Sequence, residues 1–303
     1  MFGDLLEYVN SGDVLVLNQT KVIPARLMGH RAGSGGRIEV LLLQRLEGES
    51  ERWRALTGPA RKARIGETIE FENIKCAVQE DRGEGEKIIE FDKRGEDFWH
   101  AIDQIGQVPL PPYLDRPPEE ADKERYQTVF AIKLGAAAAP TAGLHFTTEL
   151  LKAIERRGVT IAKITLHTGL GTFRPVEVED ISTHHMHEEW YELDEENAKI
   201  INTAKQAGKR VFAVGTTTVR TLETLANDDG TVNSGSGMSD IFIYPPYKLK
   251  VPNAIITNFH LPKSTLIMMI SAFAGREFTL QCYEHAIKEG YRFYSYGDAM
   301  LIL

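Results

Sequence analysis

Helix-type and strand-type patterns alternate along the second half of this chain, and this alternation constrains the fold more than any other feature. Short apolar runs of strand type lie at 159–166, 211–214 and 254–257, and helix start signals stand at Thr147 or Thr148, Asp194, Gly215 and Ser264. Strands separated by helices pair in parallel, and the helices cover both faces of the sheet. We therefore predict an α/β domain with a largely parallel sheet. The helix from Ser264 to Ala274 is apolar all round, which predicts a place in the core, and a last helix is predicted to begin at Thr279.

The segment from Arg37 to Phe91 has a different character. It contains short strand-like stretches separated by glycine-rich and acidic turns, a pattern typical of a small β-barrel or sandwich. Residues 12–18, which precede it, resemble a strand of the large sheet. The β-rich part is then an insertion in a discontinuous domain: we predict an α/β domain from residues 1–27 and 107–303 and a barrel from 28–106. A short helix is expected before Gly106, and a stiff extended linker at 109–113.

Composition limits the classes of function. The chain has 303 residues, 42% of them hydrophobic, and a formal charge of -8, which argues against binding nucleic acid over its whole surface. Cys76 and Cys282 are far apart and in no paired motif, which suits a reducing compartment. No apolar run is long enough to span a bilayer, and the first residues lack the pattern of a signal peptide. We expect a cytoplasmic protein that does not associate with membranes.

Histidines are concentrated in the part of the chain where the strands and helices alternate. Six of the nine lie between residues 145 and 260. His167 and His260 follow strands, and ligands of open α/β sheets bind beyond the carboxyl ends of strands. Because imidazole titrates near neutral pH, proton transfer is a natural role. For any one histidine, a purely structural role as a loop tether is equally compatible with the sequence.

Other motifs leave alternatives open. The run from His184 to His187 lacks the one-turn spacing of helical metal ligands, so a substrate-contacting or solvated loop is favoured over a metal site. Gly169-Leu170-Gly171 is not followed by the helix and third glycine of a dinucleotide fingerprint. Gly215-Thr216-Thr217 stands between a strand and a helix, where backbone N–H groups bind anions or ribose, although ordinary capping explains it equally well.

The β-rich segment carries one basic run. Five basic residues without an intervening acid predict a positive face, with Trp53 as a stacking aromatic, that contacts nucleic acid. The alternative is a solvated strand surface. The five are Arg52, Arg54, Arg61, Lys62 and Arg64.

Taken together, the motif blocks of this chain resemble the S-adenosylmethionine:tRNA ribosyltransferase-isomerase family of queuosine biosynthesis. The blocks include Gly12-Asp13 to Arg26-Leu27, Ala139 to Phe146, Thr165 to Pro175, Ala213 to Thr217 and Thr257 to Pro262, so the resemblance covers the whole chain. Members of that family usually begin several dozen residues upstream of the position of Met1, and they carry glycine where Pro246 stands here.

The resemblance implies a reaction. The ribosyl part of S-adenosylmethionine is transferred to 7-aminomethyl-7-deazaguanine in tRNA and isomerised, which gives epoxyqueuosine and releases adenine and methionine. S-adenosylmethionine is a consumed substrate, no metal is implied, and we expect a monomer. We assign acid or base roles to His145, His167 and His260, with His187 in reserve. The predicted substrate-binding residues are Thr141, Gly143, Phe146, Phe173, Thr216, Thr217, Asn258 and Phe259. The alternatives are a metal-dependent hydrolase and a noncatalytic RNA-binding protein.

Overall fold

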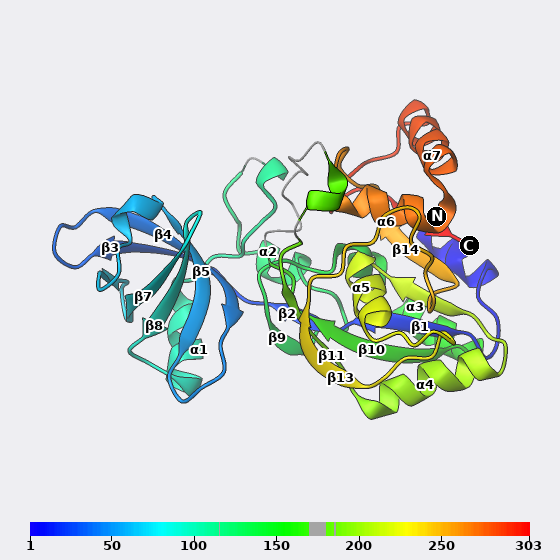
Figure 1. The fold of residues 1–303 in the computed structure, drawn as a ribbon, viewed down its shortest axis with the longest axis horizontal. Helices are drawn as coiled ribbons and strands as arrows, with labels where there is room; N and C mark the ends of the chain where they lie inside the picture. The colour runs from blue at the N-terminus through cyan, green and yellow to red at the C-terminus, as the bar shows by residue number, and fades with distance from the viewer. Residues whose placement is uncertain (115, 170–179, 185) are drawn as a thin grey trace.

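The computed structural model describes residues 1–114, 116–169, 180–184 and 186–303. It shows an α/β domain that carries a closed β-barrel to one side (Figure 1). Both chain ends lie on the α/β domain, away from the barrel. The predicted fold class is therefore confirmed. The predicted boundaries at 27/28 and 106/107 stay predictions.

A seven-stranded sheet forms the centre of the α/β domain, in the order β13-β11-β10-β1-β12-β14-β15. Its four middle strands are parallel, and Val16 pairs with both Ala162 and Ala213. The three outer strands run antiparallel to their neighbours. The parallel strands are β10 (Thr160–Leu166), β1 (Val14–Asn18), β12 (Val211–Val214) and β14 (Ala254–Asn258); the others are β11 (Glu189–Leu193), β13 (Gly235–Ser239) and β15 (Ala299–Ile302).

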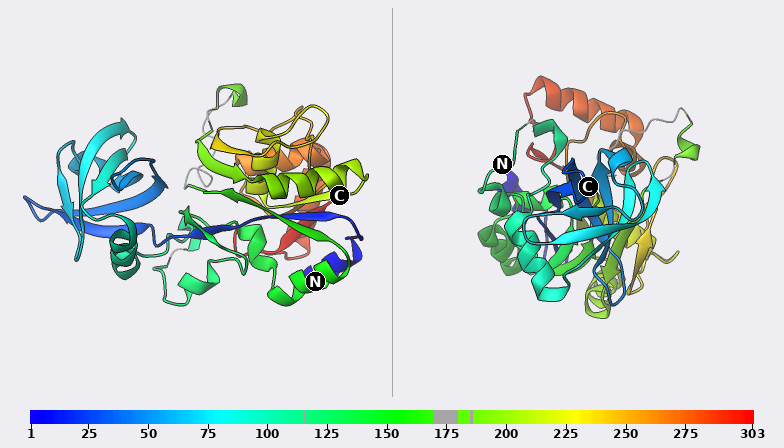
Figure 2. Two further views of the ribbon diagram at one scale, coloured as in Figure 1. Left: turned by 90° about the horizontal axis from the view of Figure 1, so that it is seen from below. Right: turned by 90° about the vertical axis from the view of Figure 1, so that its left-hand side faces the viewer.

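Alternating side chains of the sheet enter two separate hydrophobic clusters. Val14 and Val16 of β1 pack beneath helices α4, α5 and α6, whereas Leu15 and Leu17 pack against α3 and the N-terminal turn η1. Figure 2 shows these layers on the two faces of the sheet. The elements are η1 (Phe2–Glu7), α3 (Thr148–Arg156), α4 (Glu195–Gln206), α5 (Thr216–Thr224), α6 (Thr265–Ala274) and α7 (Arg276–Lys288).

The predicted helix caps are confirmed, the predicted core position of α6 is confirmed in part, and the predicted start of the last helix is wrong. Thr147, Asp194 and Ser264 each accept a hydrogen bond from the first turn of the helix that follows. Met269 and Ile270 of α6 are buried in the core, whereas residues 266–268 are half-buried, and of these three Leu266 lines a cavity. α7 begins at Arg276, three residues before Thr279, because Gly275 at φ +86° both ends α6 and precedes α7 directly.

Six antiparallel strands close into the barrel, in the order β3-β4-β5-β8-β7-β6. Helix α1 (Gly95–Ile105) packs against the barrel core, where Phe98 stacks on Trp53 with ring centroids 5.7 Å apart. The strands are β3 (Arg26–Arg31), β4 (Arg37–Arg45), β5 (Arg52–Gly58), β6 (Thr68–Glu70), β7 (Lys75–Gly83) and β8 (Glu86–Phe91).

The two connections between the domains lie side by side. A short parallel pair, β2 (Thr20–Val22) with β9 (Lys133–Ala136), joins the outgoing and returning segments of the chain. The predicted extended linker at 109–113 is wrong in part, because Leu110 is buried against Val22 and the turn η3 (Pro112–Leu114) follows. The smaller elements are η2 (Ala60–Lys62), α2 (Asp122–Arg125), η4 (Thr141–His145) and η6 (Ile181–Thr183).

Candidate active site

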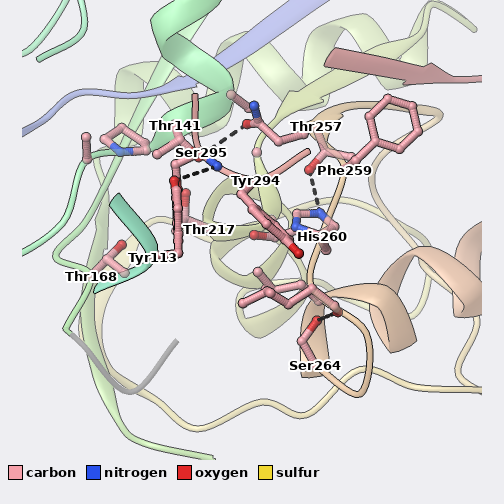
Figure 3. Close-up of a pocket in the computed structure, with 18 of the residues that line it drawn as sticks. Tyr113, Thr141, Thr168, Thr217, Thr257, Phe259, His260, Ser264, Tyr294 and Ser295 are labelled. Carbon is pink, nitrogen blue, oxygen red and sulfur yellow. Dashed lines mark hydrogen bonds between the residues drawn. The ribbon is translucent and has the colours of Figure 1, made fainter. Parts of the chain in front are cut away.

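A cavity lies at the carboxyl ends of the parallel strands, where the fold predicts ligand binding. The segments after β12 and β14 supply much of its wall, and the turn η4, the end of β10 and residues 294–295 supply the rest (Figure 3). Its open space is about 960 Å³ including the mouth, within the range of small-molecule sites. We call it the sheet cavity. Its lining residues are Tyr113, 139–142, Thr168, 215–217, 257–262, Ser264, Leu266, Tyr294 and Ser295.

His260 is the titratable group of this cavity that best suits proton transfer. It is the second residue after β14, and its Nε2 lies 2.8 Å from the hydroxyl of Thr257. Its backbone N–H donates to the hydroxyl of Tyr283 at 3.0 Å, which fixes the loop. Desolvation lowers the pKa of His260 to about 4, because burial disfavours the charged imidazolium. The ring is therefore neutral at pH 7 and able to accept a proton.

His145 contacts the wall of the cavity through Asn258. The amide nitrogen of Asn258 donates to Nε2 of His145 at 3.1 Å, and Thr141 donates to the amide oxygen at 3.2 Å. Phe2 stacks on the imidazole at 5.0 Å between ring centroids. Burial lowers the pKa of His145 as well. In this arrangement the lone pair of Nε2 is engaged, so His145 orients Asn258.

His167 lies at a second cavity, between the barrel and the edge of the sheet. Its Nδ1 is 2.7 Å from the hydroxyl of Thr20, and its ring stacks on Trp190 at 5.0 Å. Burial lowers its pKa to about 4. The exposed His187 and the barrel residue Arg54 line the same space, of about 620 Å³, which we call the interface cavity. Of the four predicted histidines, two thus belong to the sheet cavity, His260 directly and His145 through Asn258. The other two, His167 and His187, line the interface cavity.

The predicted substrate-binding residues divide in a similar way. Five of them line the sheet cavity: Thr141, Thr216, Thr217, Asn258 and Phe259.

Two of the remaining residues have structural environments instead. Phe146 is only 2% exposed and packs between Phe2 and Phe130, an environment that does not favour its predicted contact with substrate. Gly143 is buried, and a side chain there would collide with Phe130, which explains the glycine by packing. Phe173 lies outside the described residues.

The basic run of the barrel is less uniformly positive than its sequence suggests. Neighbouring strands supply acids: Arg52 pairs with Glu80 at 3.3 Å, and Arg54 makes two bonds to Glu86 at 3.0 and 3.2 Å. The predicted stacking by Trp53 is wrong, because its side chain fills the barrel core with 0% exposure. A loop after β5 carries the three remaining basic residues, Arg61, Lys62 and Arg64, of which the two arginines are exposed.

Sequence reasoning missed several residues of the sheet cavity. Tyr113 and Tyr294 lie with ring centroids 5.1 Å apart, and the hydroxyl of Tyr113 accepts the N–H of Ser295 at 2.9 Å. Tyr294 has φ +73°, an unusual backbone angle that no sequence signal predicts. Of these residues, only Tyr113 has a possible sequence signal, the proline run that precedes it.

A buried ion pair supports the wall of the interface cavity, which Glu189 and Gly169 line. Arg220 of α5 and Glu189 of β11 are both buried and pair directly, and Glu189 also accepts the N–H of Gly169 at 3.1 Å. Among the residues that the structure describes, no group of three or more His, Cys, Asp or Glu side chains could hold a metal ion, and His185 is outside that set. None of the described helices is long and apolar enough to cross a membrane.

The sheet with a ligand-sized cavity at the carboxyl ends of its parallel strands defines an α/β protein that binds a small molecule. The family model described as queuosine biosynthesis protein matches residues 1–302. This chain therefore belongs to the queuosine biosynthesis protein family, as its motif blocks predict.

Similar proteins agree with this assignment. Proteins named S-adenosylmethionine:tRNA ribosyltransferase-isomerase from Desulforamulus reducens and Moorella thermoacetica are 53% and 54% identical, over 100% of this chain and 88% of their own length. The crystal structure of an S-adenosylmethionine tRNA ribosyltransferase from Thermotoga maritima has a TM-score of 0.51 and 35% identity, and the match covers 99% of this chain and 86% of that one.

Proposed function

We propose that this protein is an S-adenosylmethionine:tRNA ribosyltransferase-isomerase whose sheet cavity binds S-adenosylmethionine. It transfers the ribosyl part to 7-aminomethyl-7-deazaguanine in tRNA and isomerises it, which gives epoxyqueuosine and releases adenine and methionine. Identity above 50% to proteins of that name along the whole chain carries this proposal. S-adenosylmethionine is a consumed substrate, and no metal takes part. We place the protein in the cytoplasm, with its tRNA, as a monomer.

Proton transfers are the main chemical demand of this reaction. The sulfonium acidifies the adjacent ribose methylene, and a neutral base at the cavity can remove one of its protons. We assign this role to His260, since it lines the cavity and its imidazole is neutral at pH 7. Departing adenine needs a proton in return, and the protonated His260 can deliver it. His145 acts through Asn258 as a positioning residue.

Aromatic side chains favour the binding of the adenosine part. Tyr113 and Tyr294 line the sheet cavity, and aromatic faces attract a sulfonium and stack on a purine, whereas the ring of Phe259 packs against Tyr283 and Phe293. These two tyrosines replace the predicted pair Phe146 and Phe173 in our assignment. Thr141 and Asn258, which are joined by a hydrogen bond, offer polar groups to ribose hydroxyls.

The modified base of the tRNA would enter the interface cavity. Its wall includes His167 stacked on Trp190, a flat surface on which a purine can continue the stack. His167 is neutral at pH 7 and can take a proton from the aminomethyl group, with His187 in reserve. We assign phosphate contacts to Arg61, Lys62 and Arg64, since Arg52 and Arg54 are already paired.

Adenine release from S-adenosylmethionine in the presence of substrate tRNA tests this function. His260→Gln should lower the rate about 10²- to 10⁴-fold, the usual contribution of a general base. His100→Gln is the matched control, because His100 is exposed on α1. Wild-type protein that binds tRNA without releasing adenine would favour the noncatalytic alternative. A fully active His260→Gln would end the assignment of the base.

A further inference from the structure

We propose that the first turn of α5, together with the hydroxyl of Thr168, binds the methionine carboxylate of S-adenosylmethionine. The inference rests on the proposed function and fixes the direction in which the substrate lies in the sheet cavity.

The N-terminus of α5 is open toward the cavity. Gly215 precedes the helix at φ +84°, and it provides no side-chain cap. Gly215, Thr216 and Thr217 line the cavity. The hydroxyls of two threonines in this turn bond to other groups and do not cap the helix. Thr218 donates to the carbonyl of Val214 at 2.7 Å, and Thr217 accepts from Asn18 at 3.2 Å. The N–H groups of a helix's first turn have no intrahelical acceptor and carry partial positive charge.

Thr168 provides a second, independent indication of a ligand. The residue lines the cavity and is 4% exposed, yet its Oγ1 has no hydrogen-bond partner among the residues that the structure describes. Its carbonyl accepts the N–H of Ala137 at 3.0 Å, which holds the residue in place. A buried hydroxyl without a partner is costly, and because Thr168, unlike Thr128, lines the cavity, we attribute its hydroxyl to a group that arrives with the substrate. Figure 3 shows Thr168 and Thr217 in the wall of one pocket.

The side chain of Asn18 connects the first turn of α5 to the end of β10. The amide nitrogen of Asn18, at the end of β1, donates both to Thr217 at 3.2 Å and to the carbonyl of Leu166 at 3.0 Å. Asn18 also accepts the N–H of Leu166 at 3.1 Å. The first turn of α5 and the end of β10, two residues before Thr168, are therefore held at a fixed separation.

The charges of the cavity and of S-adenosylmethionine indicate which group of the substrate binds at the first turn of α5. Within the described lining of the sheet cavity there is no Lys, Arg, Asp or Glu, so the helix terminus supplies the positive potential. S-adenosylmethionine has one negative group, the carboxylate, and two positive groups, the ammonium and the sulfonium. Only the carboxylate is attracted to the positive end of a helix. The methionine end then lies at α5, and the adenosine end lies toward Tyr113, Tyr294 and His260.

Decarboxylated S-adenosylmethionine is the direct probe, because it differs from the substrate by this one group. Isothermal titration of the full chain should give about 10- to 100-fold weaker binding than with S-adenosylmethionine, the range for losing charge-assisted hydrogen bonds. Thr168→Val should weaken binding of S-adenosylmethionine about 10-fold and leave binding of the decarboxylated probe unchanged. Thr128→Val is the matched control: Thr128 is also buried, its hydroxyl also lacks a partner, and it does not line the cavity.

The outcomes separate this inference from the proposed function. Equal affinity of the wild-type protein for the two compounds would overturn the inference, even if adenine is released normally. A Thr168→Val variant that loses affinity for both compounds equally, or for neither, would also overturn it. Wild-type protein that neither binds S-adenosylmethionine nor releases adenine would overturn the function itself.

Discussion

Burial of two imidazoles makes the stability of this protein depend on pH in a range where few other groups titrate. The pKa values of His167 and His260 are about 4 in the folded chain, against 6.5 for the solvated side chain. Below pH 6.5 the unfolded chain therefore binds more protons than the folded one. The free energy of unfolding must fall as the pH is lowered from 7 toward 4.

The size of this effect follows from the two pKa values. At pH 5 an unfolded histidine is almost fully protonated, while a folded one with a pKa of about 4 is mostly neutral. Linkage then gives a loss of about 2 kcal/mol per histidine between pH 7 and pH 5, and about 4 kcal/mol for the pair. Carboxylates contribute little in this range, since their reference pKa values of 3.8 and 4.5 lie below it.

Urea unfolding at pH 7 and at pH 5 measures the difference. Wild-type protein should lose about 2 kcal/mol more than His260→Gln over this range, because the variant cannot take up that proton. His100→Gln, on the surface of α1, should lose as much as wild type. If His260→Gln and wild type lose the same free energy, the ring of His260 is not held neutral by burial, and its assignment as a base fails.

Three further predictions concern neighbouring parts of the structure. Gly135→Ala would place a Cβ 2.6 Å from Nε2 of His167, and the backbone φ of +149° at this position is strained for alanine. We therefore expect adenine release to be about tenfold slower or more, and a rate equal to wild type would contradict the placement of the His167 ring. Glu189→Gln leaves the buried Arg220 unpaired and should lower the free energy of unfolding by about 3–5 kcal/mol, with the exposed Glu188→Gln as control. Replacement of the three basic residues Arg61, Lys62 and Arg64 by serine should weaken tRNA binding and reduce its salt dependence. Unchanged affinity in a filter-binding titration would exclude this loop from the tRNA contact.

Local signals in the sequence were sufficient for most elements of the fold. Caps such as Thr147 and Ser264 act within one turn of a helix, and alternating apolar residues define a strand without knowledge of its partners. The α/β class, the inserted barrel and the place of residues 12–18 in the sheet could therefore be predicted. The same motifs also indicated the family, which the whole-chain match confirms.

Local sequence signals could not predict contacts between segments that are far apart in the chain. Phe146 follows a motif histidine directly, yet its neighbours in space are Phe2 and Phe130, which make it a core residue. Arg54 stands in an unbroken basic run, but the pairing of β5 with β8 places Glu86 beside it. A one-dimensional pattern cannot show which residues a barrel brings opposite each other.

The sequence by itself determined the chemical types present at the site: imidazoles, threonines and an asparagine at the ends of strands. Only the tertiary structure decided how they are distributed, with His260 and Thr168 at one cavity and His167 at another. The physical reason is that periodicity fixes which face of an element is buried, whereas the pKa of a histidine and the partner of a hydroxyl depend on the segments packed around them.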